Sequence, residues 1–225
     1  MSLTLLQLRT LFRQEADDAN SPYLWSDAEL NDYANDAQNE ACRRARLLVD
    51  STTAAICQYT VASSGSGSYL IALDSRVLFV RRARLASRTV PLARMFLSDI
   101  EEQVPNWEAA TAGQPDRYIP DYQTGYVRLY RPSSVADTLN LTVVRMPLTD
   151  MSADGDVPEI HTAWHRSLRF WMLYRAYSKH DAETYDEKKA AANLKLFEEE
   201  FGRRSAAFDE EWLREHQVDS YDGQA

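Results

Sequence analysis

Two histidines have a spacing that metal sites use. His161 and His165 lie four residues apart in a segment predicted to be helical, so one face of the helix would carry both imidazoles. A metal site needs a third ligand, and a zinc protease needs a glutamate base at a fixed position beside the first histidine. The sequence shows neither, and Leu168 and Met172 continue the face of His161. The pattern favours two ordinary histidines at a helix edge over a metal site.

Carboxylates occur in short runs that suggest no acid–base pair. A general acid–base pair needs one desolvated carboxyl group and one ionised partner at a defined separation. The runs fall instead on polar faces or in the acidic C-terminal segment, where solvated carboxylates are expected. They are Asp17-Asp18, Glu101-Glu102, Glu198-Glu199-Glu200 and Asp209-Glu210-Glu211. Nucleophile elbows, Walker loops and dinucleotide fingerprints are absent from the sequence. We therefore predict a protein that is not an enzyme and that uses no cofactor and no metal.

Arginines form two clusters that suit contacts between subunits. In an acidic chain, such clusters pair with acidic neighbours across an interface more often than they bind DNA. We expect the clusters to contribute to an interface between copies of the chain. Their members are Arg43, Arg44 and Arg46 in the first, and Arg81, Arg82 and Arg84 in the second.

The C-terminal segment combines acidic residues with aromatic ones. Phe208, Trp212 and Leu213 form half of a helical stripe within a segment too acidic to build its own core. Exposed aromatic residues of this spacing are typical anchors for a groove on a partner protein. The alternative is that these side chains fold back onto the rest of the chain, and the sequence does not decide between the two.

Composition limits the class of protein. Among 225 residues, 34 acidic against 25 basic side chains give a net charge of -9, which argues against a dedicated nucleic-acid binder. Cys42 and Cys57 have no metal-ligand spacing and are expected to be reduced thiols. No apolar run approaches a membrane span, and the first residues lack the features of a signal peptide. We expect a protein that is made in the cytoplasm.

The elements that position these residues fall into three segments. Helices are predicted over 4–16 and 26–49, each opened by a capping box, Thr4 with Gln7 and Ser26 with Glu29. Further helices are predicted over 160–178 and 182–201, and the first of these is apolar on nearly every side, as in a buried central helix.

The middle segment has the pattern of short strands separated by turns. A short helix is expected over Phe96–Val104. The predicted strands are Ala55–Val61, Tyr69–Leu73, Val77–Leu85, Thr89–Leu92, Arg117–Pro120, Tyr126–Tyr130 and Thr138–Val144. The predicted fold class is α+β, a helical bundle formed from the N- and C-terminal segments with an inserted small antiparallel β-domain. Its predicted parts are residues 1–50 with 157–204 for the bundle, 51–156 for the β-domain, and 205–225 for an acidic, partly flexible tail.

The succession of motifs resembles phage head-to-tail adaptor proteins. The opening resembles theirs in Leu8-Arg9, Trp25-Ser26-Asp27-Ala28-Glu29-Leu30 and Asn35-Asp36-Ala37-Gln38. The strand block resembles theirs in Gly113-Gln114-Pro115, the run from Tyr126 to Pro132, and Thr138–Val143. The run from Pro158 to His161, Ala176-Tyr177, Asp181–Thr184 and Phe197 complete the pattern.

This resemblance implies a structural virion protein at the head–tail junction. It implies a homo-oligomeric ring of about twelve copies that closes through repeated head-to-tail contacts. The ring would bind the portal protein and a tail or nozzle protein. The C-terminal segment contributes nothing to the resemblance, and from its residues we predict that Phe208, Trp212 and Leu213 bind the portal. DNA would pass through the channel without sequence-specific binding. The alternatives are a tail-tube, stopper or nozzle-type subunit and, more remotely, a metal-dependent tail hydrolase that uses His161 and His165.

Overall fold

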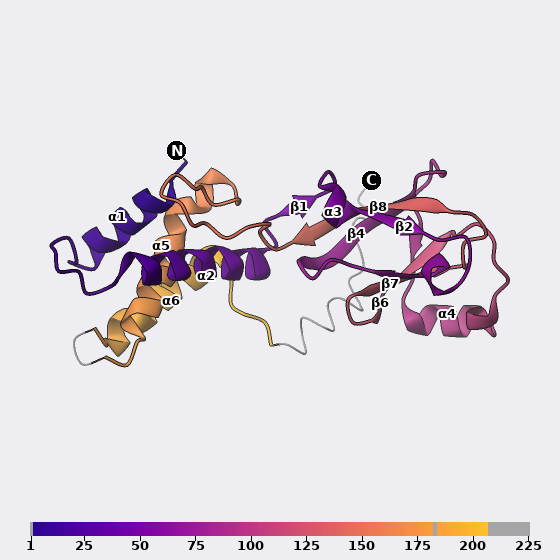
Figure 1. Ribbon diagram of the computed structural model, residues 1–225. Coiled ribbons are helices and arrows are strands. Elements are labelled where there is room, and N and C mark those ends of the chain that lie inside the picture. The colour runs from indigo at the N-terminus through magenta and orange to yellow at the C-terminus, as the bar shows by residue number, and fades with distance from the viewer. Residues whose placement is uncertain (1, 182–183, 207–225) are drawn as a thin grey trace, which may run out of the picture. The chain divides into compact units, whose positions relative to one another are not determined.

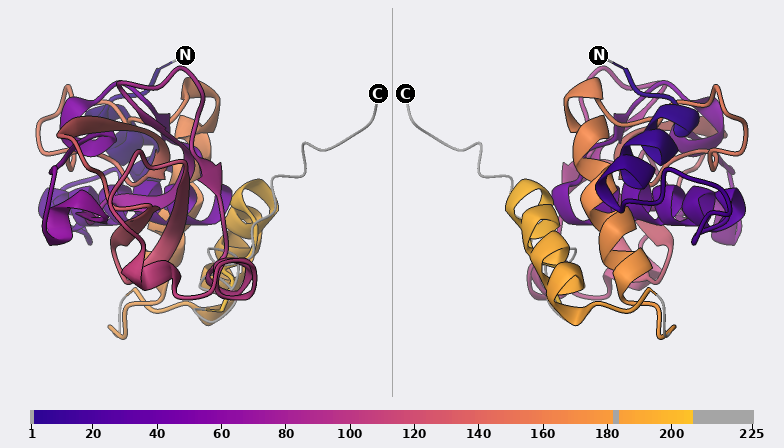
Figure 2. Two further views of the ribbon diagram at one scale, coloured as in Figure 1. Left: turned by 90° about the vertical axis from the view of Figure 1, so that its right-hand side faces the viewer. Right: turned by 90° about the vertical axis from the view of Figure 1, so that its left-hand side faces the viewer.

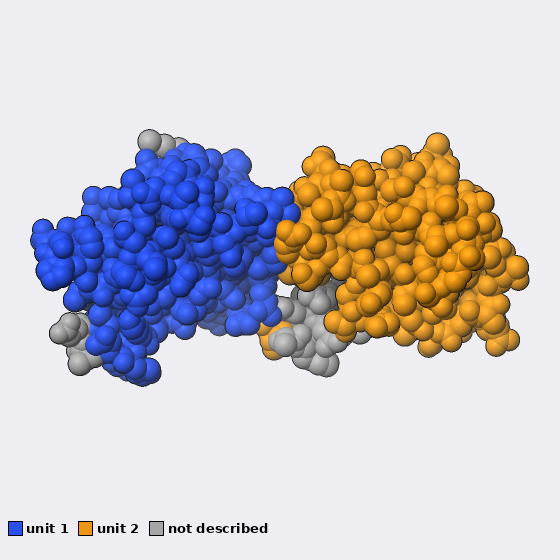
Figure 3. Space-filling view, in the orientation of Figure 1, with its two compact units in different colours: residues 1–48, 146–204 blue, residues 49–145, 205–225 orange. Residues whose placement is uncertain are grey.

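The protein consists of two compact units, one helical and one built on β-sheets. A computed structural model describes residues 2–181 and 184–206 (Figure 1). The helical unit joins Met1–Leu48 to Met146–Arg204, and the β unit is formed by Val49–Arg145 (Figure 3). Segments from both ends of the chain thus make the helices, and the sheets are inserted between them. The predicted α+β fold class is confirmed.

Capping boxes open the first two helices. In α1 (Leu5–Glu15), the Gln7 amide donates to Thr4 Oγ1 at 3.3 Å, and the Thr4 amide donates to Gln7 Oε1 at 2.9 Å. In α2 (Asp27–Ala45), Ser26 and Glu29 make the same exchange at 3.2 and 3.0 Å. Both predicted caps are confirmed. Alanines and larger apolar residues of α2 then line the core, namely Leu30, Tyr33, Ala34, Ala37 and Ala41.

A buried helix from the C-terminal half lies at the centre of the helical unit. α5 (Leu168–Tyr177) packs against α1, α2 and α6 (Glu187–Phe201), as the views of Figure 2 show. A 3-10 helix, η3 (Thr162–Ser167), precedes α5, and its N-cap is His161. The predicted helix over 160–178 therefore begins later than expected and with a tighter first part. Leu168 is fully buried and Trp171 is 8% exposed, so both belong to the core as predicted.

The segment that follows the last strand belongs to the helical unit. Met151 is buried in the helical core, and its backbone exchanges hydrogen bonds with the Asn35 side chain at 2.8 and 2.9 Å. The Leu5 amide also donates to the Asp156 carbonyl at 2.8 Å. These contacts place residues 146–156 with the helices, whereas the sequence pattern grouped them with the β-domain.

Buried arginines join the first two helices. The Arg13 guanidinium donates to Asp18 at 2.5 Å and to Asp27 at 2.8 Å, and it stacks on Tyr23. Arg9, equally buried, lies 3.5 Å from Asp27. The hydrogen bond from Arg13 lowers the pKa of Asp27. The carboxylates thus compensate the buried positive charges, as burial of a charge requires.

One strand organises the first sheet of the β unit. β8 (Asp137–Arg145) pairs with β1 (Val49–Asp50) and β2 (Gln58–Val61) along one edge and with β4 (Val77–Leu85) along the other. All of these pairs are antiparallel. Residues Ala54–Cys57, predicted to begin a strand, form the short helix α3 instead. The amides and hydroxyls of Thr52 and Thr53 make four hydrogen bonds to Asp50, and these bonds hold the chain in the turn that precedes α3.

The second sheet has the order β3-β7-β6-β5, from Leu70–Ala72, Tyr126–Tyr130, Arg117–Gln123 and Ala93–Arg94. The named strand pairs of the β unit are antiparallel, as predicted, except for the β5–β6 pair, which is parallel and makes this sheet mixed. The predicted strand Thr89–Leu92 is also not formed. Pro91 has no amide to donate to a ladder, and the only strand in this region starts two residues later.

Helix α4 (Leu97–Gln103) and the 3-10 turn η2 (Trp107–Ala109) cover a small core of the β unit. Ile100, Trp107, Ile119 and Tyr130 pack together there. Among the described residues, no helix combines the length and the apolarity needed to cross a membrane.

Candidate functional site

The two histidines of the candidate metal pair are used in structural hydrogen bonds. His165 is 1% exposed; its Nδ1 accepts the Leu3 amide at 3.1 Å, so Nε2 carries the proton and donates to the Ile160 carbonyl at 2.9 Å. His161 is exposed, and its Nδ1 accepts the Ala163 amide at 3.3 Å. In residues 2–181 and 184–206, no group of three His, Cys, Asp or Glu side chains could hold a metal ion.

The cysteines and the first two carboxylate runs are either buried in structural contacts or exposed to solvent. Cys42 and Cys57 are buried, and burial raises the pKa of the Cys57 thiol to about 11, so it is protonated at neutral pH. Asp18 is buried against Arg13, while Asp17 is exposed. Glu101 and Glu102 are exposed on α4. These groups offer no desolvated acid beside an ionised base.

The first arginine cluster lies at the end of α2 and is largely internal. The Arg44 side chain is 4% exposed, pairs with Glu40 at 3.0 Å, and lies over the rings of Trp171 and Phe197. It therefore joins α2 to α5 and α6. Arg43 and Arg46 are half-buried, and each has a partner within the chain. The assignment of this cluster to an interface between subunits remains a prediction. The charge of Arg44 is already compensated within the chain by Glu40.

The second arginine cluster is exposed on β4. A bulge between Val80 and Arg82 interrupts the alternation of the strand, so Arg81 and Arg82 are both exposed, and Arg84 follows on the same side as Arg82. Within the described part of the chain, none of the three forms an ion pair. The bulge is a long-range feature that residue types alone do not indicate.

Arg82 and Arg84 lie on a polar face of the first sheet. Arg82 stands opposite Thr142, and Arg84 stands opposite Asn140, which has Gln58 on its other side. Directly opposed residues share a face, and alternate residues of a strand repeat it. The intervening residues Ala83, Leu85, Leu139 and Leu141 are buried on the other face. We call the outer surface the arginine face; it consists of Ser51, Gln58, Arg82, Arg84, Asn140 and Thr142.

The arginine face carries an open hollow of about 130 Å³. Ser51, Arg82, Arg84, Asn140, Leu141 and Thr142 line it. The polar side chains of the face form no hydrogen bond with one another or with other described residues. Two guanidinium groups beside an amide and two hydroxyls offer a dense set of hydrogen-bond donors, with no carboxylate among the residues that line the hollow. The arrangement suits a carboxylate or another oxyanion.

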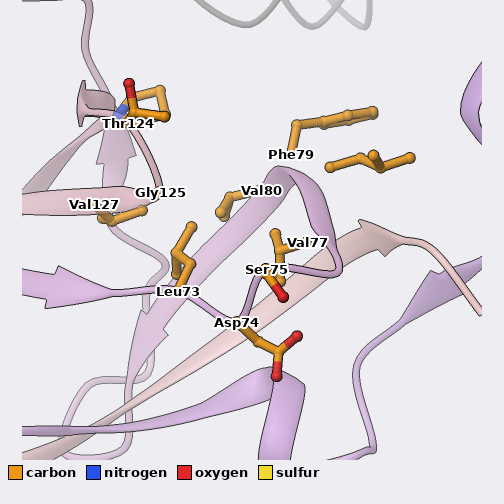
Figure 4. Close-up of a pocket in the computed structure, with 11 residues that line it drawn as sticks. Leu73, Asp74, Ser75, Val77, Phe79, Val80, Thr124, Gly125 and Val127 are labelled. Carbon is orange, nitrogen blue, oxygen red and sulfur yellow. The ribbon is translucent and has the colours of Figure 1, made fainter. Parts of the chain in front are cut away.

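An apolar hollow of about 290 Å³ lies elsewhere in the β unit, between the start of β4 and the β6–β7 hairpin. Figure 4 shows Leu73, Val77, Val80 and Val127 directed toward its interior, with Asp74 at one side. The hydrogen bond from Arg76 lowers the pKa of Asp74 to about 2. The lining supplies apolar contacts and no arrangement of catalytic groups.

A buried carboxylate supports the sheet next to the arginine face. Asp50 precedes Ser51 and receives the Arg145 Nε–H at 2.7 Å, with both side chains less than a tenth exposed. Burial alone would raise the pKa of Asp50, but hydrogen bonds from Thr52, Thr53 and Arg145 outweigh it and hold the pKa well below its usual range. The pair fixes β1 and the turn after it against β8.

Phe208, Trp212 and Leu213, expected to anchor the tail on a partner, lie outside the described residues.

Within residues 2–181 and 184–206, the histidines and cysteines singled out by the sequence are placed in structural contacts, and the arginine face and the apolar hollow are the two concave surfaces described above. The family model described as SU10 adaptor protein matches residues 3–219. The chain belongs to this family of phage head-to-tail adaptors, which confirms the resemblance found in the sequence motifs. The protein is therefore a structural component of the virion, and its family is not a class of enzymes. No curated protein matches the chain.

Proposed function

We propose that copies of this chain form a closed ring that joins the portal to the tail and leaves a channel for DNA. Membership of the SU10 adaptor family over residues 3–219 is the observation that carries the proposal. Closed rings arise when one surface of a subunit contacts a different surface of the next and the rotation closes. A chain with a helical unit and a separate β unit offers two such surfaces. We expect about twelve copies, which is the number that the resemblance to head-to-tail adaptors implies.

The charge of the chain suits a channel through which DNA moves without being retained. At -9 per subunit, a ring carries a field that repels phosphates. The portal contact is assigned to the acidic C-terminal segment, with Phe208, Trp212 and Leu213 as apolar anchors. A tail or nozzle protein binds the opposite side of the ring.

Native mass spectrometry of the full chain, alone and with portal, tests this proposal. We expect monomers in dilute buffer and a ring of about twelve copies when portal is present, because the template offsets the entropy of closure. A chain that ignores portal but assembles with tail proteins would instead be a tail-tube or stopper subunit. Stable rings without portal would contradict the role of the template, although they would leave the ring itself intact.

A further inference from the structure

The negative charge of the chain is concentrated outside the β unit. Val49–Arg145 contains ten arginines and nine carboxylates, a net charge of +1. The remainder of the chain contains 15 basic and 25 acidic side chains, a net charge of -10. The β unit therefore differs in charge from the acidic remainder of the chain. A contact between the β unit of one copy and the acidic part of another would be electrostatically favourable.

Most arginines of the β unit already have partners within it. Arg76, Arg117, Arg128 and Arg145 pair with carboxylates, and Arg128 also lies 4.4 Å from the centre of the Trp107 ring. Arg88 donates to the Pro115 carbonyl, and Arg94 lies over Phe96. In the described part of the chain, the three arginines of β4 have no such partner. Arg131, which follows β7, also forms no ion pair within the described residues, so β4 carries the one group of neighbouring unpaired arginines in the described part of the unit.

We propose that the arginine face binds carboxylates on the helical unit of a second copy of the chain. This inference rests on the proposed ring and specifies one of its contacts. Arg82 and Arg84 are two residues apart on one side of β4, about 7 Å along the strand, which suits two neighbouring carboxylates. Arg81, exposed by the bulge, adds a third charge at the rim.

The hollow between the two arginines fits the size of a carboxylate group. Its volume is about 130 Å³, well above the ~10–15 Å³ that one water needs on the same measure, so a carboxylate group can enter it. The Asn140 amide and the Ser51 and Thr142 hydroxyls can donate to the same oxygens. Hydrogen bonds to ionised acceptors are the stronger kind, which compensates the loss of water.

The helical unit presents carboxylates that are available for this contact. It carries 19 acidic and 14 basic side chains in Met1–Leu48 and Met146–Arg204. Asp32 on α2, and Glu187 and Glu200 on α6, are exposed and form no ion pair within the described residues. A basic face on one copy and an acidic unit on the next make a heterologous contact that repeats around a ring.

Nucleic acid fits the arginine face less well. Proteins that hold single strands stack bases on aromatic side chains, and none of the six residues of the arginine face is aromatic. Proteins that hold duplexes neutralise several phosphates with a larger basic surface, whereas this chain is acidic. A protein carboxylate is therefore the favoured partner.

Charge reversal on the arginine face tests the inference. Self-association of the full chain with portal is measured by sedimentation velocity for wild type and for Arg82→Glu/Arg84→Glu. The matched control is Arg131→Glu/Arg166→Glu, which makes the same charge change at two other exposed arginines. We expect the β4 variant to associate at least about tenfold more weakly, and the control to stay within about twofold of wild type. Added salt weakens wild-type association because exposed charges are screened.

A neutral variant and a reversal of the opposite charges make the test decisive. Arg82→Gln/Arg84→Gln should weaken association to an intermediate degree, and circular dichroism of each variant verifies its fold. Asp32→Lys/Glu187→Lys/Glu200→Lys, which reverses exposed carboxylates of the helical unit, should weaken association as the β4 variant does. Unchanged association of this folded variant would overturn the inference.

Two further results would overturn it. In the first, the β4 variant forms rings as well as the control does, which leaves the ring proposal standing without this contact. In the second, the β4 variant loses retention of duplex DNA while its self-association is unchanged, which identifies nucleic acid as the partner. A wild-type chain that never self-associates, even with portal, rejects both the ring and the contact.

Discussion

Replacing Asp50 by asparagine removes the negative charge from a buried ion pair while keeping the size of the side chain. Asp50 accepts hydrogen bonds from the Thr52 amide at 2.9 Å, the Thr53 amide at 3.1 Å, the Thr53 hydroxyl at 2.7 Å and Arg145 Nε at 2.7 Å. Asparagine can keep the bonds to its oxygen. Its NH₂ group would face the Arg145 donor, so that bond and the charge compensation are lost.

The expected cost follows from burial. One hydrogen bond to a charged group contributes about 1.5–3 kcal/mol. Removal of one member of a buried ion pair costs about 3–5 kcal/mol in total, because the remaining charge stays in the interior. We therefore expect Asp50→Asn to lower the free energy of unfolding of the β unit by at least about 3 kcal/mol. For a domain of this size, that lowers Tm by about 12 °C or more.

Urea denaturation followed by circular dichroism measures the effect, with Asp74→Asn as the control. Asp74 pairs with Arg76, but the two side chains are 23% and 38% exposed. Solvent screens such a pair, and its loss should cost no more than about 1 kcal/mol. If Asp50→Asn costs as little as Asp74→Asn, the buried pair does not stabilise the sheet and the reasoning from burial fails.

The same pair predicts a dependence on pH. Because the folded-state pKa of Asp50 is depressed, its ionised form contributes stability that is fully present above the unfolded-state pKa of about 4. This contribution is lost as the pH falls below that value toward the folded-state pKa. The difference in stability between wild type and Asp50→Asn should therefore narrow below about pH 4. A difference that stays constant down to strong acid would contradict the shift.

Three further predictions concern the helical unit and the tail. Trp171→Ala should lower the free energy of unfolding by about 3–5 kcal/mol in urea denaturation, because removal of the large ring beside Phe197 leaves a cavity. A variant as stable as wild type would place Trp171 outside the core. His165→Ala should cost about 2–3 kcal/mol by leaving the Leu3 amide and the Ile160 carbonyl without a partner. His161→Ala removes an exposed helix cap and should lower the free energy of unfolding by about 1 kcal/mol at most. If the two histidine variants lose the same stability, the structural role assigned to buried His165 is wrong. Deleting the residues after Gly202 should leave the thermal melt nearly unchanged and weaken portal binding at least about tenfold in a pull-down titration, whereas unchanged binding would give the tail another role.

The sequence determined the features whose partners are close along the chain. Thr4 with Gln7, and Ser26 with Glu29, are three residues apart, so residue type and spacing were enough to predict both caps. The apolar stripes predicted the buried faces of the helices, and the motif order indicated the adaptor family. Val77–Leu85 and Tyr126–Tyr130 were predicted with the bounds that the strands have, because their alternation and flanking turns are local.

Only the tertiary structure decided how distant residues meet. Arg44 was grouped with Arg43 and Arg46 by sequence, but packing of α5 and α6 covers it with Trp171 and Phe197. The pairing of Asp50 with Arg145 joins residues 95 positions apart, and nothing in either neighbourhood specifies it. The bulge in β4 likewise depends on the register with β8, and it exposes Arg81 beside Arg82. Strand register and helix packing are set by the summed burial of many side chains. Local spacing therefore identified both arginine clusters, but it could not show that Arg44 is internal while the arginines of β4 are exposed.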